Sequence, residues 1–340
     1  MTNMWIQARR VLGALTLMFV LAVASPISAQ QRNPDNSVNP TASSVKEDQL
    51  LQQLKIINGR GTIPDSKSYN IEQPAGRDWR QFHEVTLPWV GAVVILLMLA
   101  ALVGFYLWRG MVKIQAGRTG RLVVRFNEFE RFVHWMTATC FIVLALSGLN
   151  ITFGRQLLMP ILGADTFASW SQFAKYAHNY LSFPFTIGVL LILFMWIGNN
   201  IPNGVDVNWI QRGGGIVGDD HPPAEKFNAG QKMIYWIVVL GGSASAITGY
   251  LLMFPFYATD IAGMQTAQMF HGIVAVLFVA AMLAHIYIGT LGMEGAFEAM
   301  GTGSVDENWA KQHHSLWLAD VKERSNQETP RSRPAATPAE

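Results

Sequence analysis

The chain has 340 residues, of which 50% are hydrophobic and only 14% are charged, and its formal net charge is +2. Soluble proteins usually carry about 25% charged residues, so this composition favours a membrane protein and argues against a nucleic-acid-binding one. The single cysteine, Cys140, excludes an internal disulfide and a cluster that needs about four cysteine ligands. Since Cys140 lies in an apolar run, we interpret it as a core residue.

The N-terminus predicts a cleaved secretory signal peptide, residues 1–29. A basic start precedes an apolar run at 11–23, which is shorter than the about 20 residues that a spanning helix needs, and small residues follow. A retained membrane anchor is the alternative. The next segment, 30–86, is polar and contains no long apolar run, so it predicts an extracytoplasmic extension.

Five apolar segments follow, each long enough to cross a bilayer about 30 Å thick as a helix. Trp and Tyr lie at several of their ends, as is typical of the membrane interface. The first segment predicts an additional N-terminal transmembrane helix, and the other four predict a helical bundle within a domain at 109–292. The fold class is therefore all-α and integral to the membrane, with predicted spans at 87–108, 132–153, 178–199, 232–254 and 269–292.

The distribution of Lys and Arg predicts how the chain is oriented. The segments 109–131, 200–231 and 293–340 are richer in these residues, and they alternate with poorer ones. Because positively charged loops stay in the cytoplasm, the richer segments are predicted to be cytoplasmic, the last of them as a tail. A multi-pass protein of the bacterial inner membrane follows, with a periplasmic mature N-terminus, in agreement with the cleaved signal.

Four histidines lie in or at the edge of the predicted spans: His134, His178, His271 and His285. An ionisable residue within a span is costly and indicates function. Singly, each could be a packed residue that is hydrogen-bonded to a neighbouring helix, but four at matched depths favour cofactor ligands. His271 and His285 are 14 residues apart, which is about 21 Å along one helix and nearly the same side of it.

The predicted topology sorts these histidines into two pairs. His178 and His271 lie near the outer face, whereas His134 and His285 lie near the cytoplasmic face. Two facing imidazoles at each level predict the axial ligands of two b-type haems. A structural zinc site is disfavoured because it needs about four ligands in one place. Arg125 and Arg131, just before His134, either neutralise haem propionates or supply ordinary cytoplasmic charge.

Several motifs carry a family resemblance. They resemble the gamma subunit, the cytochrome b subunit, of membrane-bound respiratory formate dehydrogenase, whose wider family includes the cytochrome b subunits of nickel–iron hydrogenases. The resemblance covers residues 120–320, and its specific part is the NAGQK stretch together with the preceding NIP, Asp206 and Trp209. The motifs are RFVHW at 131–135, LALSGLN at 144–150, NNIP at 199–202 with Asp206 and Trp209, FNAGQK at 227–232 and WAKQHH at 309–314.

The resemblance implies that the four histidines bind two haems and that Asn228, Gly230 and Gln231 lie at a quinone pocket by the cytoplasmic haem. An asparagine amide can donate a hydrogen bond to a quinone carbonyl, and a glycine leaves the backbone open. Asn228 also fits the N-cap of the fourth span. Both roles can hold at once.

The resemblance further implies two partners, an iron–sulfur beta subunit and a catalytic alpha subunit that oxidises formate. This chain would carry electrons from the periplasmic side across the membrane to quinone, and it has no formate site of its own. One alternative is a cytochrome b for another donor, such as nickel–iron hydrogenase or thiosulfate reductase. Others are a haem-binding membrane anchor without quinone turnover and a transporter that uses its histidines as proton relays.

Overall fold

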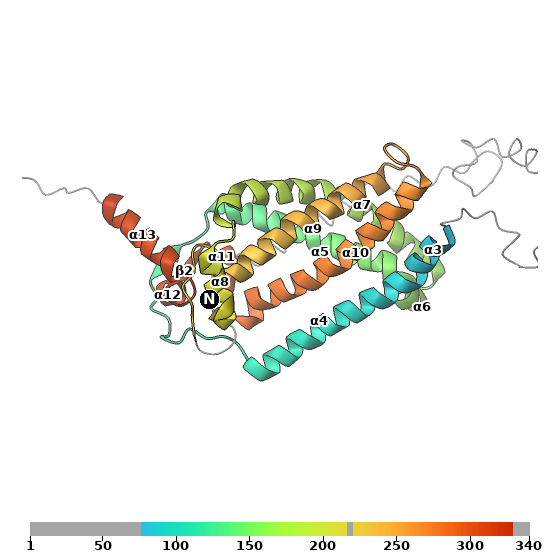
Figure 1. The fold of residues 1–340 in the computed structure, drawn as a ribbon. Helices are drawn as coiled ribbons and strands as arrows, with labels where there is room; N and C mark the ends of the chain where they lie inside the picture. Colours follow the sequence, from blue (N-terminus) through green and yellow to red (C-terminus); the bar gives the residue numbers. More distant parts are fainter. Residues whose placement is uncertain (1–75, 216–219, 329–340) are drawn as a thin grey trace, which may run out of the picture. The chain divides into compact units, whose positions relative to one another are not determined.

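The structure, a computed structural model, describes residues 76–215 and 220–328 (Figure 1). The predicted signal peptide at 1–29, the extension up to residue 75 and the end of the tail from 329 lie outside the described residues.

Five long helices dominate the described part of the chain (Figure 1). With their short helical continuations they form five candidate membrane spans, each long and apolar enough to cross a bilayer. The predicted all-α membrane bundle is therefore confirmed. The helices are α4 (Leu87–Arg109), α5 (Glu128–Leu157), α7 (Ala164–Trp196), α9 (Ala229–Met253) and α10 (Ile261–Tyr287).

Several helices begin earlier than the predicted spans because capping residues, not hydropathy, set their ends. Asn127 begins α5 with a capping box, in which it accepts from the backbone nitrogen of Glu130 at 2.9 Å and Glu130 reciprocates. Asp260 caps α10 by accepting from Gly263 N at 2.8 Å. The spans predicted from apolar runs therefore miss the polar first turns of these helices.

Helical structure also precedes α4, within the segment predicted as an extension. A short helix α3 (Gly76–Gln81) and a π-helical turn η2 (Phe82–Thr86) lead into it. Trp79 donates from Nε1 to Gln268 Oε1 of α10 at 3.1 Å and stacks on His83. This contact ties the start of the first span to the last one.

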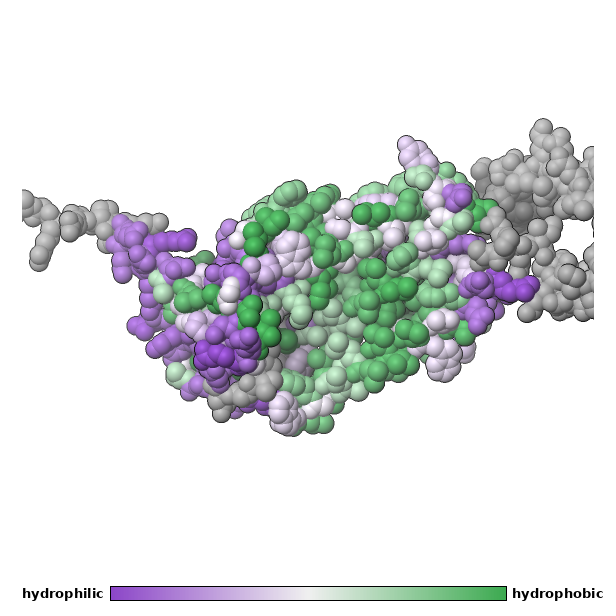
Figure 2. Space-filling model, viewed as in Figure 1, coloured by the Kyte–Doolittle hydropathy of each residue, from purple (hydrophilic) through white to green (hydrophobic). Residues whose placement is uncertain are grey.

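The long helices approach each other closely at glycines. A Cβ at Gly188 of α7 would lie 2.1 Å from Thr137 Oγ1 of α5, and one at Gly272 of α10 would lie 2.6 Å from Leu87 of α4. Small residues at such crossings are typical of membrane helices, whose association depends on packing. Figure 2 shows hydrophobic residues over the faces of the long helices and hydrophilic residues at both ends, as a lipid-embedded bundle requires.

One end of the bundle carries a folded cap, which we call the end cap: the described residues of 110–127, 200–228 and 293–328. A two-stranded antiparallel ladder joins β1 (Leu122–Val124) to β2 (Ser304–Asp306). Buried Trp309, Trp317 and Leu318 pack into the main core, so the predicted tail is folded structure up to residue 328. The remaining short elements are α6 (Met159–Leu162), η3 (Ile197–Asn199), α8 (Gly204–Gln211), η4 (Gly213–Gly215), η5 (Ile288–Gly292), α11 (Ala296–Gly301), α12 (Glu307–His313) and α13 (Ser315–Glu328).

Candidate functional site

The four intramembrane histidines come together in the two predicted pairs. His178 of α7 faces His271 of α10 with ring centres 6.2 Å apart, and we call these two the outer pair after the predicted orientation. His134 of α5 faces His285 of α10 with ring centres 6.3 Å apart, and we call these two the inner pair. The helix α10 therefore contributes one imidazole to each pair.

The spacing within each pair fits one metal ion between two imidazoles. A metal–nitrogen bond is about 2 Å, and a ring nitrogen lies about 1.2 Å from the ring centre by ordinary bond lengths. Two rings on opposite sides of one iron would therefore have centres about 6.4 Å apart, close to the 6.2 and 6.3 Å observed. Each pair offers two facing imidazoles, the ligand set that suits a haem iron. In the described part of the chain, no three His, Cys, Asp or Glu residues cluster as a metal site.

Asn228, Gly230 and Gln231 form the start of α9. Asn228 Oδ1 accepts from Gln231 N at 2.9 Å, and Gln231 Oε1 accepts from Asn228 N at 3.2 Å. A Cβ at Gly230 would lie 3.3 Å from the ring of Trp209. The structure thus shows the N-cap that the sequence predicted. Neither hydrogen bond of this capping box uses the side-chain nitrogen Nδ2 of Asn228.

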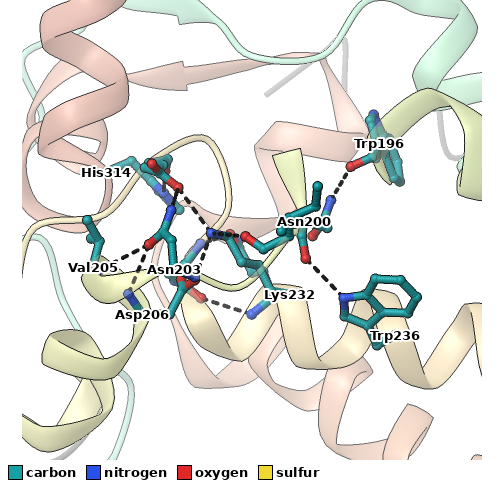
Figure 3. A network of polar contacts seen from close by, with 12 residues as sticks. Trp196, Asn200, Asn203, Val205, Asp206, Lys232, Trp236 and His314 are labelled. Carbon is teal, nitrogen blue, oxygen red and sulfur yellow. Dashed lines mark hydrogen bonds and ion pairs between the residues drawn. The ribbon is translucent and has the colours of Figure 1, made fainter. Parts of the chain in front are cut away.

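A buried ion-pair network anchors this start of α9 to α8 (Figure 3). The side chain of Lys232 is only 3% exposed, and its Nζ lies 2.8 Å from Asp206 and 3.0 Å from Glu225. Asp206 also accepts from Asn203 N at 2.8 Å, at the start of α8. The Asp206–Lys232 pair joins the NAGQK motif to the stretch that begins with NNIP, a contact that the sequence did not predict.

Asn200 makes a second connection in the same region (Figure 3). It is fully buried, donates from Nδ2 to Trp196 O at 2.8 Å, and its backbone oxygen accepts from Trp236 Nε1 at 2.9 Å. The end of α7 is thereby held against α9. These motifs therefore shape the fold, whatever ligand they also contact.

Arg125 lies buried in the end cap. Its guanidinium lies over the rings of Phe126, Trp309 and Trp317, with 5.1–5.4 Å to their centres. It donates from Nη2 to Lys226 O at 2.5 Å and lies 3.1 Å from His314 Nε2. Burial lowers the pKa of Arg125 to about 9. The sequence alone did not reveal this structural role.

Arg131 is also used by the end cap. It donates from Nε to Met300 O at 3.3 Å and from Nη2 to Gly301 O at 2.9 Å. Arg131 thus holds the end cap against the start of α5, whereas Arg125 joins segments of the end cap to one another. These contacts come in addition to the two roles predicted for them.

The hydrogen bonds of His314 require a neutral imidazole. Because Arg125 can only donate, Nε2 of His314 accepts, and its Nδ1–H donates to Glu225 O at 2.7 Å. Burial, followed by the charge of Arg125, holds the pKa of His314 well below its usual range. Burial also lowers the pKa of neighbouring His313 to about 3, with His221 and Arg125 adding to the effect.

We expect the end cap to lose stability in acid. Both histidines are neutral above pH about 6.5 whether the cap is folded or not. As pH falls below this value, the histidines bind protons in the unfolded cap but not in the folded one. The free energy of unfolding of the cap therefore falls from pH about 6.5 toward pH about 3, the pKa of His313 in the folded cap. Thermal unfolding measured across this range should show the decline, and a double His313→Asn, His314→Asn variant should flatten it. An equal slope in both proteins would contradict the assignment.

Comparison with known families adds evidence beyond the geometry. A family model described as prokaryotic cytochrome b561 matches residues 125–303, a stretch that includes all four paired histidines. The match supports b-type haem as a cofactor of this chain.

Among curated proteins, the chain is similar to the formate dehydrogenase, cytochrome b556(fdo) subunit of Escherichia coli K12, with 29% identity over 204 residues, 59% of this chain and 93% of the relative. The nitrate-inducible cytochrome b556(Fdn) subunit of the same organism is 25% identical over 208 residues, with the same coverage. The formate dehydrogenase, cytochrome b556 subunit of Haemophilus influenzae is 26% identical over 219 residues, 62% of this chain and 87% of the relative. The predicted resemblance is confirmed.

Proposed function

The chain belongs to the prokaryotic cytochrome b561 family, and from this premise we propose that it is the di-haem cytochrome b subunit of a formate dehydrogenase complex. The observation that carries the proposal is the placement of two histidine pairs on one bundle, each at the spacing of a two-imidazole iron site. The three relatives named above are all formate dehydrogenase subunits, and they are the reason to propose formate as the electron donor.

His178 and His271 would hold one haem, and His134 and His285 the other. A bound haem accepts and releases one electron at its iron. Since His271 and His285 are about four turns apart on α10, the pairs lie at two depths, about 21 Å apart along that helix. The chain would thereby lead electrons through the apolar layer from one face to the other.

The end cap is proposed to lie on the cytoplasmic side of the inner membrane, with the mature N-terminus in the periplasm. It carries the Lys- and Arg-rich segments on which the predicted orientation depends. Electrons would enter by the outer pair from a periplasmic iron–sulfur beta subunit, which receives them from a catalytic alpha subunit. With one cysteine, this chain depends on such partners for iron–sulfur clusters and formate oxidation.

We propose quinone as the acceptor, at Asn228, Gly230 and Gln231. The amide nitrogen of Asn228 can donate to a quinone carbonyl while its oxygen caps α9. A site on the cytoplasmic side would draw the two protons of quinone reduction from the cytoplasm. Inward electron flow with proton uptake there would add to the membrane potential.

The purified complex tests the proposal. Formate should reduce two low-spin b-type haems, and quinone should reoxidise them. Reduction by hydrogen or thiosulfate in place of formate would identify another member of the wider group of cytochromes b. Haems that formate reduces but quinone leaves reduced would indicate an anchor without quinone turnover. An absorption spectrum without b-type bands would overturn the proposal altogether.

We expect Asn228→Ser to separate the capping role from the quinone role. Serine preserves the N-cap, so the cost to helix stability should be a few tenths of a kcal/mol, whereas Asn228→Ala should cost about 1 kcal/mol. Both variants lack the amide donor and should slow haem reoxidation by quinone alike, roughly tenfold for one lost hydrogen bond. Stopped-flow reoxidation and thermal unfolding measure the two effects. If the Asn228→Ser variant reoxidises its haems at the wild-type rate, Asn228 does not belong to the quinone site.

A further inference from the structure

The outer histidines each contact a hydroxyl on a neighbouring helix. His178 Nδ1 of α7 lies 2.8 Å from Ser147 Oγ of α5, and His271 Nδ1 of α10 lies 3.0 Å from Thr248 Oγ1 of α9. All four helices of the haem-binding bundle thus meet at the outer level, two with an imidazole and two with a hydroxyl. Ser147 belongs to the LALSGLN motif, which the proposed function leaves unexplained.

The direction of both hydrogen bonds follows from the second contact of each hydroxyl. Ser147 Oγ lies 2.7 Å from Val143 O, and Thr248 Oγ1 lies 2.7 Å from Ala244 O. A carbonyl can only accept, so each hydroxyl gives its single proton to the backbone and accepts from the imidazole. Nδ1 therefore carries the proton in both outer histidines, and Nε2 keeps the lone pair that binds iron.

A glycine follows each hydroxyl residue and lies beside the same imidazole. A Cβ at Gly148 would lie 3.6 Å from Cε1 of His178, and one at Gly249 would lie 3.3 Å from Cε1 of His271. The dipeptides Ser147-Gly148 and Thr248-Gly249 are thus matched in chemistry and in contact. We call them the two imidazole seats.

The inner pair has no such seats. The Nδ1 of His134 is buried and has no hydrogen-bond partner among the described residues, and no hydroxyl in that part of the chain bonds to His285. The two pairs have nearly the same ring spacing, but they differ in what the Nδ1 atoms contact.

We propose that the two imidazole seats fix the iron-binding nitrogen of the outer ligands and lower the midpoint potential of the outer haem. The inference rests on the proposed function. An imidazole that donates from Nδ1 is a more basic ligand, which favours ferric over ferrous iron. Each hydroxyl is a better acceptor because it also donates to a carbonyl. A lower outer potential favours electron transfer from the outer to the inner pair.

Potentiometric titration of the purified complex tests this proposal with Ser147→Ala, Thr248→Ala and the double variant. Changing outer-shell partners of a metal ligand commonly alters affinity tenfold or more. A tenfold loss of ferric preference would raise the potential of one haem by about 59 mV, the value for a one-electron couple. The His178→Ala variant, expected to keep only the inner haem, identifies which potential belongs to which level.

Two kinds of control keep the test specific. Ser147→Thr and Thr248→Ser keep the hydroxyls and should keep the wild-type potential. Thr152→Ala removes a hydroxyl of α5 that donates to Gly148 O at 3.1 Å and contacts neither pair, so both potentials should stay unchanged. Loss of the outer haem alone from the double variant would also support the seats, provided that Thr152→Ala keeps both haems.

Other results would overturn the inference. If the double variant binds two haems at wild-type potentials, the seats do not tune the outer haem. If the midpoint potential of the inner haem changes and that of the outer haem does not, the two imidazole seats do not act on the outer haem. Failure of the proposed function would appear differently, as a wild-type complex without two b-type haems.

Discussion

His178→Ala and His271→Ala are each expected to remove one of two b-type haems and to leave the other bound. The two rings face each other at 6.2 Å, so either substitution would leave an iron held between them with one protein ligand. The matching loss of the inner haem is expected for His134→Ala and His285→Ala, whose rings are 6.3 Å apart. Haem extracted per purified chain should therefore fall from two to one in all four variants.

Reduced-minus-oxidised spectra assign each loss to a level. Variants of the same pair should lose the same component of the spectrum, and variants of different pairs should lose different ones. His83→Ala is the matched control, because His83 precedes α4 and its ring stacks on Trp79 and not on a paired histidine; it should keep both haems. Retention of both haems in all four ligand variants would show that the histidines serve another purpose.

The histidine pairs could be predicted because each step of the inference is local. Apolar runs mark the spans, and a helix of known rise converts the 14 residues between His271 and His285 into a difference in depth. The alternating direction of successive spans then decides which histidines share a level, and the loop charge decides which level is cytoplasmic. None of these steps uses a contact between residues that are distant in the sequence. The pairing of the histidines is the only distant contact, and it is the result of the inference.

The end cap could not be predicted because its contacts join distant residues without a periodic pattern. Arg125 meets His314 across 189 positions, and β1 pairs with β2 across a similar stretch of chain. In the sequence, Arg125 is one positive charge among several near a membrane face. Nothing in the sequence shows which residues the WAKQHH motif contacts. Only the fold shows that an arginine there is buried among aromatic rings.

The imidazole seats were missed for a different reason. Ser147 and Thr248 occur within helices where a serine or threonine commonly bonds to its own backbone, and each does so. Their second contact depends on the rotation of α5 and α9 about their axes. The LALSGLN motif indicated that this stretch matters, but its chemistry required the position of His178.

The NAGQK motif combines a predicted local feature with an unpredicted distant one. The capping box of Asn228 and Gln231 follows from their three-residue spacing. Lys232, the next residue, instead holds this turn against Asp206 of α8. The ion pair therefore positions the residues that we propose to contact quinone.

Lys232→Met is expected to destabilise the protein by about 3–5 kcal/mol, because it leaves a buried carboxylate without its partner. The side chains of Lys232 and Asp206 are 3% and 8% exposed, so water cannot replace the lost contact. Glu225 is 43% exposed and should contribute less. The temperature at which the detergent-purified complex loses its haem absorbance measures the effect.

Two further variants decide whether the loss comes from the buried ion pair. Arg121→Ala breaks a pair with Glu307 in which the arginine is 75% exposed, so it should cost at most about 1 kcal/mol. A double Lys232→Met, Asp206→Leu variant removes both charges and should recover part of the stability, since a buried pair can be replaced by apolar residues. The recovery should be incomplete, because Asp206 also accepts from Asn203 N. A Lys232→Met protein as stable as wild type would show that the network does not hold α9 in place.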